Sequence, residues 1–314
     1  MRLFRFLFFF IGSLIGPALY GQADNFSFSK AESELAILAN RVVNDSLLED
    51  RLAAYEQFEA NLLTTLEQPA SFHYPFEAIQ SVSIQQAPDS TFRIFTWQLF
   101  VDNDTYKYGG LIQKNDEKGS IYPLVDDSEN IETYDIEYET LGSEEWYGAL
   151  YYNIFAFDSL ETKYLLFGYD GFEFFRKRKV AEILTFDEDG VPVFGAPLFT
   201  KEIEGYSSNS KNRLYLEYDA SIAVRLNYDE KMNIIIHDHL VQMRGQYKGQ
   251  GMVNVPDGSY EGYFYENGVW NYKEKIFDLV SEEPPREDDK EENLRKERLD
   301  IFGGKKQRIK KKKN

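Results

Sequence analysis

Hydrophobic positions near the start of the chain recur at a helical spacing. Between residues 29 and 67, leucine, valine and aromatic side chains follow one another at intervals of three, four or six residues, which places them on one face of an amphipathic helix. Ser29 and Ser46 each precede a glutamate by three residues, so two capping boxes predict two helix starts. The polar run at residues 44–46 fits either two helices or one kinked helix. We interpret the apolar face as part of the core rather than as a groove for a partner.

From residue 76 onward the pattern changes to short strands separated by polar turns. Aromatic and β-branched residues at 92–101 and 106–112 flank three polar residues, which predicts an antiparallel hairpin. Asn267-Gly268 is the strongest hairpin signal, because both residues tolerate the positive φ that a type I′ turn requires. Further hairpins are predicted for 149–157 with 163–169, 182–186 with 191–194, 221–228 with 232–237, and 260–265 with Trp270.

These elements predict an α+β fold that is mainly β. An N-terminal amphipathic helical segment at residues 24–75 precedes an antiparallel β-meander at residues 76–280. The pattern does not choose among a barrel, a sandwich and a blade-like arrangement. Residues 281–314 combine dense charge, two prolines and few apolar side chains, which predicts a disordered linker with a basic tail.

Residues 1–23 have the features of a signal peptide. Two arginines precede an apolar run at residues 6–16, Pro17 interrupts that run, and Gly21 and Ala23 form a small-x-small cleavage site. The apolar stretch is shorter than the roughly 20 residues that a membrane-spanning helix needs. We therefore expect an exported protein, located in the periplasm, the cell envelope or outside the cell, with no transmembrane span in the mature chain.

Composition narrows the classes of function. The chain of 314 residues contains no cysteine and has a formal net charge of −18. Thiol catalysis, cysteine metal ligands and disulfides are therefore excluded, and stability has to come from packing. An acidic body repels the phosphate backbone, so no nucleic-acid partner is expected. No motif of high specificity for a cofactor or for catalysis occurs, so we expect no cofactor and name no catalytic residue.

One stretch, "FGYDGFEFFRKRKV" at residues 167–180, combines aromatic side chains with four consecutive basic residues. Asp170-Gly171 ends a predicted strand, and glycine supplies the backbone freedom of a tight turn. The basic residues could bind a phosphate or a sugar acid. Neighbouring side chains of a strand point to opposite faces, however, so we interpret them as a solvated turn or a blunted sheet edge. The candidate binding residues are Tyr169, Arg176, Lys177, Arg178 and Lys179, together with Trp270 as an aromatic surface for a sugar ring.

Two histidines form the candidate metal site. His237 and His239 lie on one face of a predicted strand, a spacing that suits paired imidazole ligands, with Asp238 pointing away. A catalytic zinc site usually has three protein ligands, so a carboxylate would have to complete it. The alternative is a strand end whose polar side chains enter a loop.

Several stretches resemble a known group of proteins. The signal peptide ending "ALYGQA", followed by "WYGALYYNIF", "KYLLFGYDG" and "PDGSYEGYFYENGVW", is similar to an exported family of Bacteroidota-type bacteria to which no activity is assigned. The resemblance implies a single unit of helix and β-sheet in the cell envelope and provides no catalytic residue. We therefore expect a non-catalytic envelope protein that binds a glycan or another envelope protein. The alternative is a hydrolase that acts on envelope or extracellular polysaccharide through paired carboxylates.

The basic tail leads to a first testable prediction. Seven of the last ten residues are Lys or Arg, and each charge near an anionic membrane surface contributes about 1 kcal/mol of attraction. The alternatives are a solvated tail and a tail that folds back onto the acidic body. If the tail binds membranes, the full-length protein will sediment with anionic liposomes at low salt and less at high salt, because screening shortens the range of the attraction. Equal sedimentation of a variant that lacks residues 303–314 would rule out the tether.

Overall fold

The computed structural model describes residues 26–131, 136–157, 161–203, 206–207 and 210–277. The predicted signal peptide and basic tail lie outside these ranges. Helix α1 spans Phe28–Asn44 and helix α2 spans Leu48–Leu66, so the polar run separates two helices. None of the helices in the described ranges is long and apolar enough to cross a membrane.

Both predicted helix caps are wrong. The N-cap of α1 is Ser27, whose side chain accepts a hydrogen bond from the backbone N–H of Lys30. Helix α2 follows Leu47, which makes no side-chain cap. Tertiary packing accounts for the early start of α1, since the Phe28 ring stacks on Tyr74 with 5.1 Å between the ring centroids and so brings the first turn against the body.

Within the described ranges, fifteen strands form three sheets, and two more form a small ribbon. The first sheet has the order β1-β2-β3-β4 and contains β1 Ser83–Gln86, β2 Phe92–Asp102, β3 Thr105–Lys114 and β4 Ile121–Val125. The second contains β5 Leu141–Gly142, β6 Leu150–Phe157, β7 Lys163–Asp170, β8 Arg176–Phe186, β9 Pro192–Phe194 and β13 Arg213–Asp219. The third has the order β10-β17-β16-β15-β14 and contains β10 Phe199–Thr200, β14 Leu226–Asp229, β15 Ile234–Arg244, β16 Met252–Glu266 and β17 Val269–Lys273. The ribbon pairs β11 Glu202–Ile203 with β12 Tyr206–Ser207, and two short 3₁₀ helices span Ser71–His73 and Ser143–Glu145.

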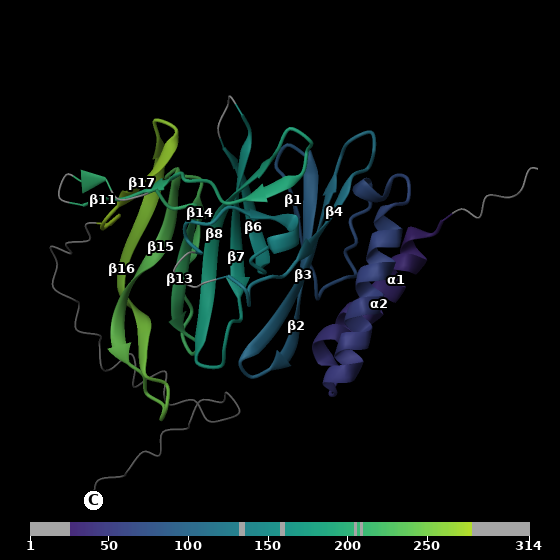
Figure 1. The fold of residues 1–314 in the computed structure, drawn as a ribbon, viewed down its shortest axis with the longest axis horizontal. Coiled ribbons are helices and arrows are strands. Elements are labelled where there is room, and N and C mark those ends of the chain that lie inside the picture. Colours follow the sequence, from purple (N-terminus) through teal and green to yellow (C-terminus); the bar gives the residue numbers. More distant parts are fainter. Residues whose placement is uncertain (1–25, 132–135, 158–160, 204–205, 208–209, 278–314) are drawn as a thin grey trace, which may run out of the picture.

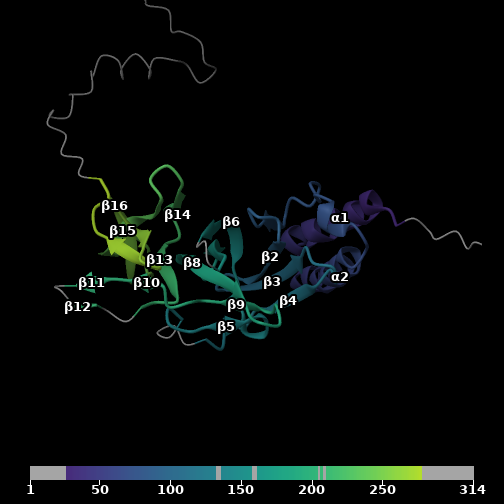
Figure 2. The same cartoon turned by 90° about the horizontal axis from the view of Figure 1, so that it is seen from above.

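The helices and the three sheets stack as four successive layers. In Figures 1 and 2 the helices lie at one side, followed by the first, second and third sheets. One core cluster fills each of the three spaces between layers. The second sheet is therefore buried on both faces, which explains the unbroken apolar run of β7. The structure confirms an α+β fold that is mainly β, and its described strands form stacked open sheets rather than a closed barrel.

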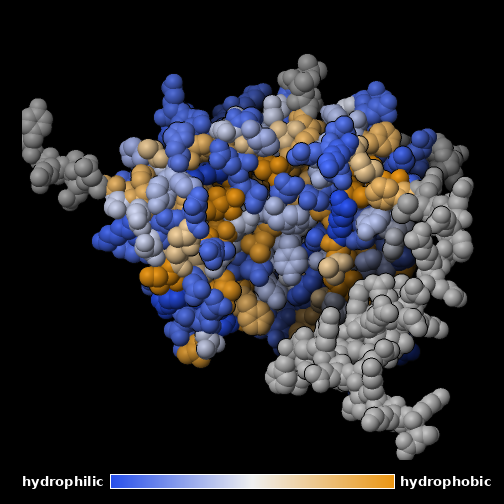
Figure 3. All heavy atoms as spheres, turned by 180° about the vertical axis from the view of Figure 1, so that it is seen from behind, coloured by the Kyte–Doolittle hydropathy of each residue, from blue (hydrophilic) through white to orange (hydrophobic). Residues whose placement is uncertain are grey.

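Hydrophobic side chains pack mainly between these layers. On the face shown in Figure 3, hydrophobic residues form separate patches among hydrophilic ones. A surface of this kind is normal for a protein whose apolar stripes and faces are covered by neighbouring layers.

The predicted hairpins are confirmed as antiparallel pairs. Strands β2 and β3, β6 and β7, β8 and β9, β14 and β15, and β16 and β17 pair in this way. Asn267 and Gly268 have φ angles of 55° and 83°, as a type I′ turn requires. The hairpin expected from residue 221 is shorter than predicted, because β14 begins at Leu226.

The segment between β7 and β8 corrects two sequence interpretations. Phe172, with φ 46°, has the left-handed backbone, and Gly171 does not. A side chain on Gly171 would place its Cβ 2.9 Å from the Tyr106 ring, so glycine is needed there for close approach. The four basic residues do not form a turn: they begin β8, which pairs with β13 along all four and with β7 at Arg178 and Lys179.

A fully buried ion pair joins β8 to β13. Glu182 and Arg213 are register partners, both side chains are 0% exposed, and Arg213 Nε donates to Glu182 Oε2 over 2.9 Å. The Arg213 guanidinium also donates to the backbone carbonyl of Ile136. The second Glu182 oxygen accepts from the Tyr151 hydroxyl, which in turn accepts from Trp146 Nε1 over 2.8 Å. Both charges therefore have the partners that a dry interior requires.

This pair gives the second testable prediction. Replacement of one partner, as in Glu182→Leu or Arg213→Leu, leaves the other charge buried and unpaired, which costs about 3–5 kcal/mol in the free energy of unfolding. The free energy of unfolding of the double variant should decrease by less than the sum of the two single-variant decreases, because no unpaired charge remains buried. Urea unfolding of the three variants measures this, and single losses below about 1 kcal/mol would contradict it.

Candidate functional site

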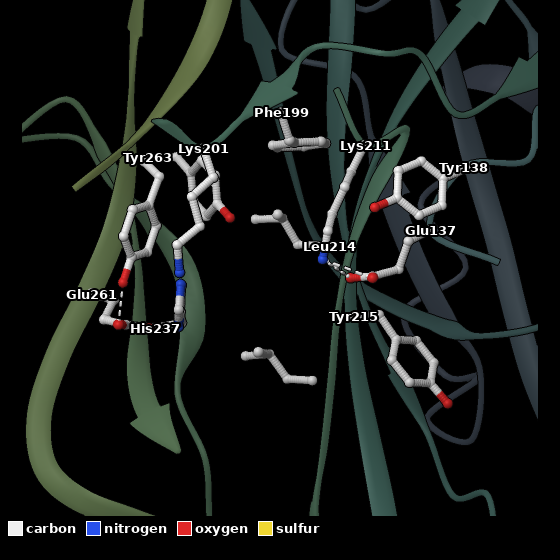
Figure 4. Close-up of a pocket in the computed structure, with 12 residues that line it drawn as sticks. Glu137, Tyr138, Phe199, Lys201, Lys211, Leu214, Tyr215, His237, Glu261 and Tyr263 are labelled. Carbon is white, nitrogen blue, oxygen red and sulfur yellow. Dashed lines mark hydrogen bonds and ion pairs between the residues drawn. The ribbon is translucent and has the colours of Figure 1, made fainter. Parts of the chain in front are cut away.

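A pocket of about 300 Å³ lies between the second and third sheets (Figure 4). It combines aromatic rings with acidic and basic side chains. Its lining residues are Glu137, Tyr138, Phe199, Lys201, Lys211, Leu214, Tyr215, Leu216, His237, Glu261, Tyr263 and Tyr272.

One wall is built by the alternation of side chains on β15, β16 and β17. Glu261 and Tyr263 are two residues apart on β16, so their side chains share a face. His237 of β15 is the register partner of Glu261, and Tyr272 of β17 is the register partner of Tyr263. The inner face of the third sheet thus presents four polar or aromatic side chains to the second sheet. Figure 4 shows His237, Glu261 and Tyr263 together on this wall.

The opposite wall is held by backbone pairing around Lys211. Lys211 and Phe199 exchange two backbone hydrogen bonds of 2.8 and 3.1 Å, and the N–H of Asn212 donates to the Glu137 carbonyl over 2.6 Å. These bonds bring Lys211 and Glu137 together, and Lys211 Nζ lies 2.6 and 2.7 Å from the two carboxylate oxygens of Glu137. Figure 4 shows this pair across the cavity from His237 and Glu261.

His237 presents a neutral imidazole. Its side chain is buried, 6% exposed, and Nδ1 lies 3.0 Å from the backbone carbonyl of Asp238. A carbonyl only accepts, so this contact assigns the proton to Nδ1 and leaves Nε2 as an acceptor. Burial lowers the pKa of His237 below its ordinary value, which keeps the ring neutral near pH 7.

Tyr263 and Tyr272 remain protonated. Burial raises the pKa of Tyr263, and the nearby carboxylates of Glu137 and Glu261 raise it further. Burial and the hydrogen bond to Glu261 raise the pKa of Tyr272, whose hydroxyl donates to that carboxylate. Lys201 Nζ lies 3.9 Å from the centre of the Tyr272 ring. The cavity therefore combines hydroxyl donors, carboxylate acceptors and flat apolar rings.

Glu137 and Glu261 place two carboxylates on opposite walls of one pocket. Each already has a polar partner, namely the Lys211 ammonium and the Tyr272 hydroxyl. Both carboxyl groups are therefore already engaged by neighbouring side chains of the protein.

The basic residues of β8 are engaged by the protein itself. Glu217 of β13 accepts from Arg176 over 2.6 Å and from Arg178 over 3.0 Å. Lys177 Nζ donates to the backbone carbonyl of Gly171 over 2.7 Å. These contacts already engage Arg176, Lys177 and Arg178, which the sequence offered as an anion site.

The other basic and aromatic candidates are also separated from the pocket. Lys179 Nζ lies 5.0 Å from the centre of the Tyr152 ring, and Tyr169 is the register partner of Lys179 on β7. Trp270, expected on a binding surface, is 1% exposed and packs in the core between the second and third sheets. Its ring therefore stabilises the layers and presents no face to a ligand.

His239 lies near the edge of the pocket but outside its lining. Its Nδ1 is 2.8 Å from Asp257 Oδ2, and its Nε2 is 3.9 Å from Glu261 Oε1. No group of three or more His, Asp or Glu side chains arranged to hold a metal ion occurs in the described ranges. Metal binding by His237 and His239 therefore stays a prediction, and the described residues add no third ligand to the pair.

Sequence reasoning missed most of the pocket. Glu137, Lys201 and Lys211 lie outside the main strands, in connecting segments with no motif around them. His237, which the sequence offered as a metal ligand, is the candidate that the structure places in the lining. No family model, curated protein or solved structure matches the chain.

His237 gives a third testable prediction. Because burial lowers its pKa, protonation favours the unfolded chain, and its contribution to stability is lost as the pH falls below its ordinary value of about 6.5. The free energy of unfolding of a His237→Gln variant should therefore decrease less than that of the wild type from about pH 7 to about pH 5. Urea unfolding at several pH values measures both slopes. Exposed His73 provides the control, since His73→Gln should keep the wild-type slope, and equal slopes for all three proteins would refute the assignment.

Proposed function

We propose that the chain is an exported, non-catalytic cell-envelope protein that binds a glycan in the pocket between the second and third sheets. The observation that carries this proposal is the mixture of side chains around one cavity. Tyrosine and phenylalanine rings stand beside Lys211, Glu137 and Glu261. A sugar has the matching chemistry, because its hydroxyl groups both donate and accept hydrogen bonds while its C–H faces are apolar.

The size and arrangement of the pocket support a small polar ligand. A volume of about 300 Å³ lies at the lower end of the range of ligand sites. Carboxylates accept hydrogen bonds from sugar hydroxyl groups, and the Lys211 ammonium donates hydrogen bonds to the oxygens of those groups. A donor and an acceptor are therefore both present on one side of the cavity. His237 Nε2 adds a neutral acceptor on the other side. His237 lies on β15, and backbone hydrogen bonds hold the segments that carry Lys211 and Glu137, which lowers the cost of ordering these groups on binding.

The envelope location rests on the sequence pattern of residues 1–23 and on the resemblance to an exported family. A cysteine-free chain is compatible with export, because its stability comes from three packed core clusters rather than from disulfides. An envelope protein encounters polysaccharide routinely, so location and pocket chemistry favour the same class of ligand.

A polysaccharide hydrolase is the second candidate function. It is favoured by the two carboxylates that Glu137 and Glu261 bring to one pocket, since glycoside hydrolysis uses a pair of such groups. One member must act as a protonated acid. The Lys211 ammonium already binds Glu137, and the Tyr272 hydroxyl already donates to Glu261, so both carboxyl groups are engaged by the protein and we rank binding ahead of hydrolysis.

The fourth prediction tests binding and turnover in one screen. The purified protein is titrated with envelope-type glycans and with neutral oligosaccharides, and the sugars are then analysed for cleavage. We expect binding without cleavage. Glu137→Gln and Lys211→Met should each weaken binding about tenfold, because a hydrogen bond to a charged group contributes about 1.5–3 kcal/mol.

Control variants separate local from general effects. Lys30 and Glu34 form an exposed ion pair on α1, with Nζ to Oε1 at 4.0 Å, far from the pocket lining. Lys30→Met and Glu34→Gln change charge in the same way and should leave glycan binding unchanged. Cleavage that disappears in Glu137→Gln or Glu261→Gln would establish the hydrolase instead. Failure to bind or cleave any glycan would refute both functions and favour a protein partner.

A further inference from the structure

Strand β13 leads from the pocket to a second hollow. Leu214 and Leu216 of β13 line the pocket, while Asp219, at the end of the same strand, lines a groove of about 600 Å³. Three residues along a strand correspond to about 10 Å. Between the two sites, Asn254 of β16 donates to the Glu217 carbonyl over 2.9 Å and ties β16 to β13. Both hollows therefore lie along one seam between the second and third sheets.

The groove presents aromatic rings to solvent. Its lining residues are Phe174, Phe175, Asp219, Ala220, Ser221, Tyr247, Lys248 and Gln250. Phe174 and Tyr247 are 58% and 59% exposed. The rings of Phe175 and Tyr247 stack with an interplanar angle of 23° and 6.3 Å between centroids. Large exposed aromatic side chains gathered in one place are typical of a binding surface rather than of a surface without function.

Hydrogen bonds hold this aromatic surface in place. The N–H of Phe174 donates to Asp104 Oδ1 over 3.3 Å, and the N–H of Tyr247 donates to Gln250 Oε1 over 3.1 Å. Gln250 Nε2 donates to Asp219 Oδ2 over 2.8 Å. The Tyr247 loop is thus tied to the body through the buried side chains of Gln250 and Asp219, and the Phe174 loop through the exposed side chain of Asp104. A platform ordered before binding loses little conformational entropy when a ligand covers it.

The groove has the chemistry of the pocket in a shallower form. Asp219 and Ser221 contribute a carboxylate and a hydroxyl to the groove lining, and Asp219 Oδ1 accepts from the Ser221 hydroxyl over 2.7 Å. Ring faces beside a few hydrogen-bonding groups suit a sugar unit, as they do in the pocket. Lys248 is the only cationic residue in the groove lining, so this second hollow favours a neutral unit over a strongly charged one.

We propose that this groove is a second subsite for the glycan that occupies the pocket, so that the natural ligand is a chain of several sugar units lying along β13. The inference rests on the proposed function. It identifies the ligand class as an oligosaccharide or polysaccharide rather than a free monosaccharide, because only a chain can occupy both hollows at once and gain affinity from each.

Ligand length and two groove variants test the proposal. The full mature chain is titrated calorimetrically with monosaccharide, disaccharide and hexasaccharide members of chito-, cello-, laminari- and malto-oligosaccharide series. We expect the hexasaccharide of the bound series to bind more tightly than the disaccharide. Phe174→Ala and Tyr247→Ala should each weaken hexasaccharide binding at least about tenfold, because each variant removes an aromatic ring that the sugar chain would cover. Monosaccharide or disaccharide binding in the pocket should not change.

The controls make each outcome decisive. Both replaced side chains are more than half exposed, so the variants should keep the wild-type unfolding midpoint. Met232, 43% exposed and outside both linings, provides a matched control as Met232→Ala. Binding that does not increase with length, or hexasaccharide affinity that is unchanged in both groove variants, would overturn the second subsite while the pocket remains. Absence of binding by every series would overturn the proposed function and this inference together.

Discussion

The buried ion pair between Glu182 and Arg213 is the interaction on which the rest of the structure depends. Both charges lie in a dry interior, where an unpaired charge is very costly, so β13 is held in one register against β8. The same guanidinium binds the carbonyl of Ile136, the residue before Glu137. The neighbouring Asn212 N–H binds the Glu137 carbonyl. The pair that orders the middle sheet therefore also places one wall of the pocket.

The layered architecture explains why the basic cluster is not the site. A sheet covered on both faces has little room for solvated charge, so its charged residues have to find partners within the protein. Arg176 and Arg178 share Glu217 on the adjacent strand, and Arg178 lies 3.0 Å from the centre of the Phe172 ring. This arrangement stabilises the β7–β8 turn, and that turn carries the exposed Phe174. The basic residues thus support an aromatic surface instead of binding an anion.

The pocket and the groove both lie along β13, where the second sheet faces the third. Leu214 and Leu216 point toward the third sheet, and the strand then continues past Glu217 to the floor of the groove. Burial keeps His237 neutral and Tyr263 and Tyr272 protonated. These neutral groups stand beside the charged side chains of Glu137, Lys211 and Glu261, and donors and acceptors with rings between them are suited to recognition of a hydroxyl-rich ligand.

The sequence by itself determined the elements, because helical spacing, strand alternation and turn chemistry depend on residues close together in the chain. Asn267-Gly268 forms the predicted turn, and the polar run after Asn44 separates the two helices. Only the tertiary structure decided how the three sheets stack, that Trp270 faces the core, and that α1 begins at Phe28. It also decided the candidate site, whose members extend from Glu137 to Tyr272. Contacts between such distant segments depend on which surfaces bury each other, and a local pattern of hydrophobic residues does not specify that choice.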